Sequence, residues 1–260
     1  MTGAERMRLL QGLLPAIVII GAWELGAHFV FDPRFVGQPS DILRYLLDEA
    51  RRGEIWTDAA ITFWEIMLGY AIGAVAGGAL GFVLGFRPRL ARIVEPYILI
   101  FSAIPKIAIA PIIIIALGIG TQSKVAIVVS MVFFLMFYAV FSGVKQIEPD
   151  FVHQARIMGA NRGEVIAYIV IPAIAPSIFD GLKTSIIFAV IGALIGEFIA
   201  AKAGLGFYIL NASGAFNING IWVGVILIVT LVFVLTTAIG IAERRVLRWL
   251  PNLDAGQGGV

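Results

Sequence analysis

Residues 151–176 read FVHQARIMGANRGEVIAYIVIPAIAP, and this stretch decides how the rest of the chain is interpreted. Apolar side chains recur in it at near-helical spacing, and Gly159 interrupts the series directly after Met158. We therefore expect two short amphipathic helices that turn at Gly159, the second of which ends at Pro172. Such helices either lie on a lipid surface or dock into a groove of another protein, and the pattern alone leaves both readings open.

Long apolar segments surround this polar stretch on both sides. Hydrophobic residues make up 60% of the 260 positions and charged residues 14%, whereas a soluble domain is about half apolar and about a quarter charged. About 20 apolar residues are needed to cross a bilayer. The composition predicts an all-α polytopic membrane protein with about six transmembrane helices. They are expected near residues 9–31, 58–86, 94–118, 124–144, 177–201 and 221–242.

The predicted organisation has three parts. Residues 1–56 hold a first, uncleaved transmembrane helix and a periplasmic amphipathic segment that starts near Pro39. Residues 57–250 form a core transmembrane domain that includes the polar loop 148–172, and residues 251–260 form a flexible tail. This plan leaves no room for a soluble catalytic domain, and no nucleophile or metal-binding motif is found. The chain is therefore expected not to be an enzyme and to hold no metal.

The distribution of basic residues predicts the orientation. With the N-terminus inside, twelve of the 19 Lys and Arg residues fall on the inner side and six on the outer side, where Lys124 and Lys202 are placed. Basic segments tend to stay cytoplasmic, so both termini are expected in the cytoplasm of a multi-pass protein in the inner or plasma membrane. The net charge of +2 is too small to indicate nucleic-acid binding.

The second predicted span carries a glycine at every fourth position. These residues line one face of a helix and allow close helix packing in lipid. The pattern is interpreted as ordinary packing or, alternatively, as a seam that slides during gating. The helix-packing candidates are Gly69, Gly73, Gly77, Gly81 and Gly85.

The third predicted span combines Pro96, Pro105 and Pro111 with Lys106 near its middle. Proline removes a backbone donor and kinks a helix, and irregular backbone at membrane depth is tolerated beside protein or water. An intramembrane lysine faces a cavity or a partner. This span is therefore expected to line a pathway, with Pro105 and Lys106 as gating candidates; a lysine that snorkels or pairs with a structural acid is the alternative.

Three acidic residues also fall within predicted spans. Glu24 is placed near the membrane interface. Glu65 lies about two turns into its span from the outside, where it is expected to satisfy a basic partner. Glu197 precedes the turn-rich sequence 203–206, where its carboxylate either caps backbone groups or faces the pathway. Glu65 and Glu197 join the pathway candidates.

The polar stretch resembles the cytoplasmic signature of type I binding-protein-dependent ABC importers. That signature reads Glu-Ala-Ala, three residues, Gly, nine residues, then Ile-x-Leu-Pro. Here His153, Gln154 and Ala155 precede Gly159, and Ile169-Val170-Ile171-Pro172 follows with both gaps matching. His153, Gln154 and Ile171 depart from the signature.

The resemblance extends over roughly residues 10–250, to the nitrate, sulfonate, taurine and bicarbonate permease family, which includes pyrimidine-precursor and riboflavin permeases. The matching pieces are 104–108 with 117–120, 176–177 with 181–183, and Glu197 with 203–206. Glu65, where sulfonate-type members often have Arg, is more similar to the pyrimidine and riboflavin branch. The resemblance implies a type I permease fold and transport of a small solute, either a nitrate-, sulfonate- or taurine-like anion or a pyrimidine- or riboflavin-type heterocycle.

The resemblance also implies the partners. They are a second permease copy in a homodimer, two ABC ATPase subunits and a periplasmic or lipid-anchored substrate-binding protein. The chain has no phosphate-loop motif, so ATP and Mg²⁺ are expected on the ATPase subunits and no cofactor on this chain. Contact with the ATPase is implied for His153, Gln154, Ala155, Met158, Gly159, Ala160, Asn161, Arg162, Glu164 and Pro172.

The rival interpretation is an ion-coupled secondary transporter with Glu65, Lys106 and Glu197 as charge carriers. Such a protein is expected to have inverted repeats with paired broken helices, and the sequence contains no such repeat.

Overall fold

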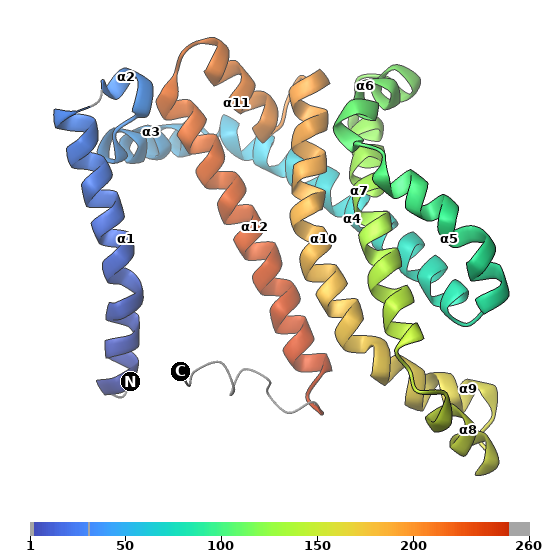
Figure 1. The fold of residues 1–260 in the computed structure, drawn as a ribbon. Coiled ribbons are helices and arrows are strands. Elements are labelled where there is room, and N and C mark those ends of the chain that lie inside the picture. Colours follow the sequence, from blue (N-terminus) through green and yellow to red (C-terminus); the bar gives the residue numbers. More distant parts are fainter. Residues whose placement is uncertain (1–2, 31, 250–260) are drawn as a thin grey trace. The chain divides into compact units, whose positions relative to one another are not determined.

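The computed structural model describes residues 3–30 and 32–249, with side chains for residues 14–30, 32 and 35–249. Within these ranges every regular element is a helix (Figure 1). The tail predicted over residues 251–260 lies outside the described residues. The chain forms two compact units: unit 1 holds the described residues of Met1–Ile61 and Lys202–Val229, and unit 2 those of Thr62–Ala201 and Thr230–Val260.

The two long helices α4 and α12 each contribute to both units. Unit 1 contains α1 (Gly3–Phe29), α2 (Pro33–Val36), α3 (Pro39–Arg52), α11 (Leu205–Gly214) and the first parts of α4 (Glu54–Gly85) and α12 (Ile218–Val246). Unit 2 contains the rest of α4 and α12 together with α5 (Pro88–Ala103), α6 (Lys106–Leu117), α7 (Thr121–Lys145), α8 (Pro149–Ile157), α9 (Arg162–Val165), the π-helical segment η1 (Ile166–Val170) and α10 (Ile171–Ala200).

Helix length and composition agree with a polytopic membrane protein. In the described part of the chain, four segments are long and apolar enough to cross a bilayer: Glu54–Gly85, Thr121–Lys145, Arg162–Ala200 and Ile218–Val246. The bent pair α5 and α6 makes a fifth if it counts as one span, and Leu14–Phe29 of α1 is a shorter apolar stretch. These segments correspond to the six predicted ones.

The third predicted span, 94–118, is not one helix. α5 and α6 meet at an angle of 90° across the break at Ile104 and Pro105. Pro105 has no N–H to donate and disfavours the α conformation for the residue before it; Ile104 is extended, with φ −65° and ψ 126°. The sequence predicted a kink and the structure has a full break.

The prediction that the second short helix ends at Pro172 is wrong. Residues 162–200 form one continuous 39-residue helix, in which α9 leads through η1 into α10. The π-helical turn ends where the Ile171 N–H donates to the Ile166 carbonyl, one residue farther back than in an α-helix. This wider turn lies directly before Pro172, whose ring would clash with a carbonyl in a regular α-helix. The proline is therefore accommodated without a helix end.

Unit 1 packs around the amphipathic helix α3, which the sequence predicted. Its buried Ile42 joins Ile55, Leu205 and Val223 in one apolar cluster. Because these four residues come from α3, α4, α11 and α12, the cluster joins the N-terminal part of the chain to the segment after residue 202.

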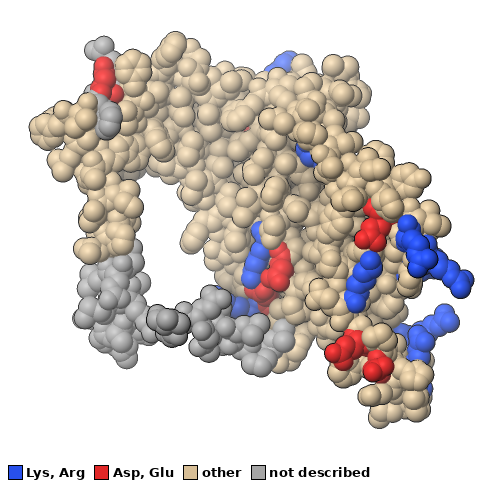
Figure 2. All heavy atoms as spheres, viewed as in Figure 1, with Lys and Arg blue, Asp and Glu red and all other residues tan. Residues whose placement is uncertain are grey.

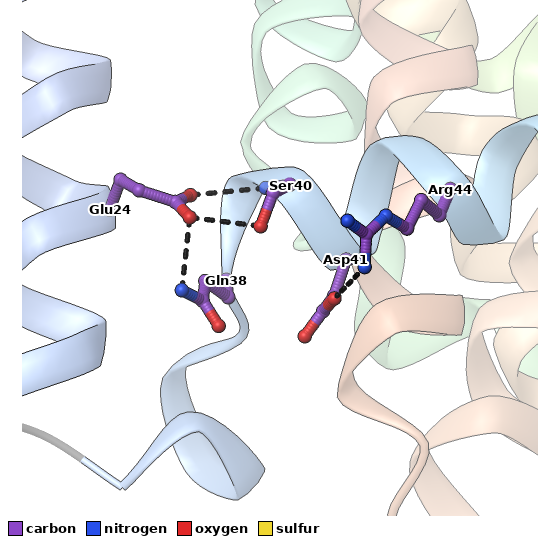
Figure 3. Close-up of polar contacts among 5 residues, drawn as sticks. All are labelled: Glu24, Gln38, Ser40, Asp41 and Arg44. Atoms are coloured by element: carbon purple, nitrogen blue, oxygen red, sulfur yellow. Dashed lines mark hydrogen bonds and ion pairs between the residues drawn. The ribbon is translucent and has the colours of Figure 1, made fainter.

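A carboxylate on α1 takes the place of a side-chain cap at the start of α3. Gln38 occupies the N-cap position, and its own side chain does not cap the helix. Glu24 instead accepts a 3.1 Å hydrogen bond from the Ser40 N–H, a 2.8 Å bond from the Ser40 hydroxyl and a 2.9 Å bond from the Gln38 amide (Figure 3). An anion is favourable at a helix N-terminus, so this buttress fixes the start of α3 against α1.

In unit 2, the five glycines of α4 face α7. A Cβ atom at Gly77 would collide with the Phe133 carbonyl oxygen, and one at Gly81 would lie 2.5 Å from the Phe137 carbonyl oxygen. Val128, Val132 and Val144 occupy the same space opposite the other three glycines. The two helices therefore approach along the whole length from Gly69 to Gly85, and we call this contact the glycine seam.

The seam can be tested with two neighbouring glycines of α4. Gly77→Ala should lower the free energy of unfolding by about 1–3 kcal/mol, because the methyl group has no space beside Phe133. Gly78→Ala is the matched control, since the nearest atom to its Cβ is 3.6 Å away and alanine has the higher helix propensity. Steric-trapping measurements in bicelles would give both values, and equal stability of the two variants would contradict the seam.

Candidate functional site

Three helices of unit 2 bring buried polar side chains together. The Lys124 ammonium in the first turn of α7 lies 3.2 Å from Oε1 of Glu65 on α4. Thr62, one turn before Glu65, donates a 2.6 Å hydrogen bond to Oε1 of Glu197 near the end of α10. No more than 5% of any of these residues is exposed. We call Thr62, Glu65, Lys124 and Glu197 the polar cluster.

A second set of close contacts brings α10 against α7 and so completes the cluster. A Cβ atom at Gly196 would lie 2.8 Å from Cγ of Lys124, and one at Gly192 would lie 3.1 Å from Cα of Val128. Farther along the same helix pair, Gly181 is similarly close to Ala139. The resemblance had marked Gly181, but only the three-dimensional contacts reveal a second seam between α7 and α10.

The structure gives Glu65 the basic partner that the sequence allowed for it. That partner is Lys124, at the start of the fourth predicted span. Burying the pair is possible because the two charges compensate each other at short distance. An acid inside a span requires a base within reach, and the first turn of the fourth predicted span supplies one.

Lys106 lies at the break between α5 and α6. Its ammonium donates hydrogen bonds to the carbonyls of Phe101, Ser102 and Ile104, at 2.7, 3.3 and 2.9 Å. It also lies 4.6 Å from the ring centroid of Phe134 on α7. Among the described residues Lys106 forms no ion pair with an acid. The lysine therefore stabilises the C-terminal end of α5, where free carbonyls concentrate negative partial charge.

The loop singled out by the sequence forms a compact turn at Gly159. φ is +93° there, a value that favours glycine. The Gly159 N–H donates to the Arg156 carbonyl and the Ala160 N–H to the Ala155 carbonyl, each at 3.0 Å, which is the Schellman pattern that closes α8. α9 then begins with a capping box between Asn161 and Glu164. These bonds fix the turn between the two helices.

The tip of this loop is exposed and partly apolar. Met158 is 86% exposed and Ile157 73%; beyond the tip, Tyr168 on η1 is 79% exposed. His153, Gln154, Arg162 and Glu164 are exposed as well, whereas Ala155 and Ala160 are partly covered. Charged residues gather toward this end of unit 2 on the face drawn in Figure 2. Exposed large apolar side chains beside charges are typical of a surface that binds another protein or a membrane.

A cavity of about 580 Å³ lies between α8 and the turn that joins α4 to α5. Asp150, His153 and Arg156 line it from α8, and Phe86 and Pro88 line it from the turn. In addition to its apolar tip, the loop therefore offers a mainly apolar recess that carries three polar side chains.

Comparisons with known proteins agree with this geometry. Residues 63–248 match the family described as "Binding-protein-dependent transport system inner membrane component". The putative aliphatic sulfonates transport permease protein SsuC of Bacillus subtilis is 24% identical over 248 residues, covering 95% of this chain and 90% of the relative. The formylaminopyrimidine transport permease protein ThiX of Halalkalibacterium halodurans is 27% identical, with 93% and 98% covered.

The fold is also similar to that of a solved transporter. A chain of the MetNI methionine ABC transporter, in an inward-facing conformation, aligns with a TM-score of 0.59 and 23% identity. The alignment covers 80% of this chain and 97% of that chain. At this identity the likeness shows a shared fold.

The buried ion pair of the polar cluster should contribute more to the free energy of unfolding than a half-exposed ion pair elsewhere in unit 2. Lys124→Met should lower the free energy of unfolding by about 3–5 kcal/mol, because it leaves the Glu65 carboxylate buried without its counter-charge. The added change Glu65→Gln should restore most of that loss. Lys145→Met, which breaks the half-exposed pair with Glu95 at 3.3 Å, is the control and should cost less than about 1 kcal/mol. Equal losses for the two lysines, measured by steric trapping, would refute the buried pair.

Proposed function

Since the chain belongs to the family of inner membrane components of binding-protein-dependent transport systems, we propose that two copies of it form the pathway for a small solute and that ATPase subunits drive the pathway through α8 and α9. The exposed turn at Gly159 is the observation that carries this proposal. Two ABC ATPase subunits on the inner side and a substrate-binding protein on the outer side complete the assembly. The chain itself hydrolyses no ATP and holds no cofactor, in keeping with its lack of a phosphate-loop motif.

The contact surface with the ATPase has two parts in this proposal. Met158 and Ile157 supply an apolar tip that enters a groove of the ATPase, and His153, Gln154 and Arg162 surround it with polar groups. Asn161 and Glu164 bond to each other in the capping box, so they act by holding the turn. Ala155 and Ala160 act in the same way, because their backbone groups close the Schellman motif.

The continuous helix from Arg162 to Ala200 supports a mechanical route for the signal. Its 39 residues span roughly 60 Å at 1.5 Å per residue. α9 at one end belongs to the proposed ATPase contact, and Glu197 at the other end belongs to the polar cluster. ATPase closure would tilt this rod and alter the packing around Glu65 and Lys124, and so switch the pathway between two states.

The names of the relatives bear on the solute. SsuC is named for aliphatic sulfonates and ThiX for a formylaminopyrimidine, so the family accepts small anions and small heterocycles. We propose that the solute of this chain belongs to one of these two classes. In this scheme the binding protein selects the solute and the permease transmits it.

Orientation follows from the charge distribution, with α8, α9 and both termini in the cytoplasm. The chain contains no cysteine, so single cysteines report their side without background labelling. A membrane-impermeant maleimide should label Phe35→Cys in right-side-out vesicles and Met158→Cys in inside-out vesicles. Both parent side chains are largely exposed, at 76% and 86%. Labelling of Met158→Cys from the outer side would contradict the proposed coupling.

Gly159 tests the coupling itself. Gly159→Val should uncouple the complex, so that ATP hydrolysis continues while uptake of the solute carried by its binding protein falls severalfold. The cause is backbone strain, because no atom lies within 4 Å of a Cβ at this position and φ is +93°. Proteoliposomes containing the permease, the ATPase and the binding protein would give both rates.

Gly53→Val is the matched control, since Gly53 has φ +85° and equally open surroundings but lies after α3. It should leave the ratio of uptake to hydrolysis unchanged. An unchanged ratio in Gly159→Val would refute coupling through this turn. Accumulation of solute by vesicles that contain the permease alone would instead favour a secondary transporter.

A further inference from the structure

A cavity of about 310 Å³ lies beside the break between α5 and α6. Met131, Phe134 and Tyr138 line it from one face of α7, Phe188 from α10, and Ser102 and Lys106 from the break. A volume of this size is at the lower end of small-molecule sites and suits a solute with a single ring. All lining residues belong to unit 2.

The cavity carries a positive charge that no acid neutralises among the described residues. The three hydrogen bonds of the Lys106 ammonium go to backbone carbonyls, which offset about half a charge at the end of α5. A net positive potential therefore remains at the cavity wall. Such a potential favours a negatively charged group within a few ångström.

Tyr138, which lines the same cavity, carries a hydrogen-bond donor without an acceptor. The Tyr138 hydroxyl is buried and has no hydrogen-bond partner in the described part of the chain. An unsatisfied buried hydroxyl is costly, so most such groups are paired. Lys106 and Tyr138 line the same cavity, and the rings of Phe134 and Phe188 provide apolar walls around them.

We propose that this cavity is a subsite of the translocation pathway for a small organic anion with a planar apolar body, in which the Tyr138 hydroxyl donates to the anionic group and Lys106 supplies the attractive field. The inference rests on the proposed function, because it assigns a solute class to that pathway. The anionic group approaches the broken end of α5, and the apolar body lies between Phe134 and Phe188.

Binding to the permease alone tests the subsite. The probes are 4-fluorobenzenesulfonate and the neutral 4-fluorobenzenesulfonamide, followed by ¹⁹F line broadening with the full chain in nanodiscs. The sulfonate should bind at least about tenfold more tightly than the sulfonamide. Tyr138→Phe should weaken sulfonate binding about tenfold, the loss expected for one hydrogen bond to a charged group. Lys106→Gln keeps donors for the carbonyls of α5 and should abolish the preference for the anion.

Two control variants should bind the sulfonate as the unchanged protein does. Lys145→Gln removes the other lysine that lies over a ring of α7, 4.1 Å from the Phe141 centroid, and Tyr97→Phe removes an exposed hydroxyl from α5. No binding, or equal binding of both probes with no effect of Tyr138→Phe, would overturn the subsite and identify a merely apolar recess.

Co-purification of the ATPase subunits, measured on the same preparations, tests the proposed function separately. A permease that retains its ATPase subunits but shows no preference for the sulfonate would overturn the subsite and leave the proposed function standing. A permease that binds the sulfonate as expected but retains no ATPase subunit would overturn the proposed function and support the subsite.

Discussion

Close contact between the backbones of α4 and α7 is the constraint on which the rest of unit 2 depends. Lipid provides no hydrophobic drive for helix association, so the helices must gain energy from van der Waals contact over a long, smooth surface. The seam from Gly69 to Gly85 supplies that surface. Near its Gly69 end, Glu65 lies against Lys124. At its other end, Gly85 lies against Val144, just before α8 begins. The polar cluster and the polar loop 148–172 thus share one support.

Where a proline interrupts the helical hydrogen bonds of this unit, neighbouring residues compensate for the interruption. The break at Pro105 leaves carbonyls of α5 without helical partners, and Lys106, the next residue, supplies the donors. At Pro172 the π-helical turn accommodates the missing N–H, so no charged side chain is needed there. The two prolines therefore have opposite outcomes: one separates two helices by 90°, and the other lies within a helix that stays continuous.

The sequence predicts most of the helical architecture because span length, glycine spacing and the turn at Gly159 are local properties. It does not predict the length of the helix that begins at Arg162, since proline rules describe regular α-helices and a π-helical turn escapes them. It also does not pair Lys124 with Glu65, because a charge count assigns each base to a side of the membrane and does not detect a buried partner. The cavity at Tyr138 has no sequence signal, as it depends on which faces of α7 and α10 meet.

In the proposed mechanism, the arrangement of continuous and broken helices in unit 2 links a displacement of α9 to the cavity beside Pro105. The helix from Arg162 to Ala200 is continuous, so in the proposed mechanism a displacement of α9 is carried along it toward Glu197. α7 is held to α4 by the glycine seam and to α10 by the contacts at Gly181 and Gly192, so any tilt of α10 must shear the second contact or carry α7 with it. Both responses move Phe134 and Tyr138 relative to the break at Pro105. In this mechanism the shape of the cavity beside that break therefore depends on the position of α9.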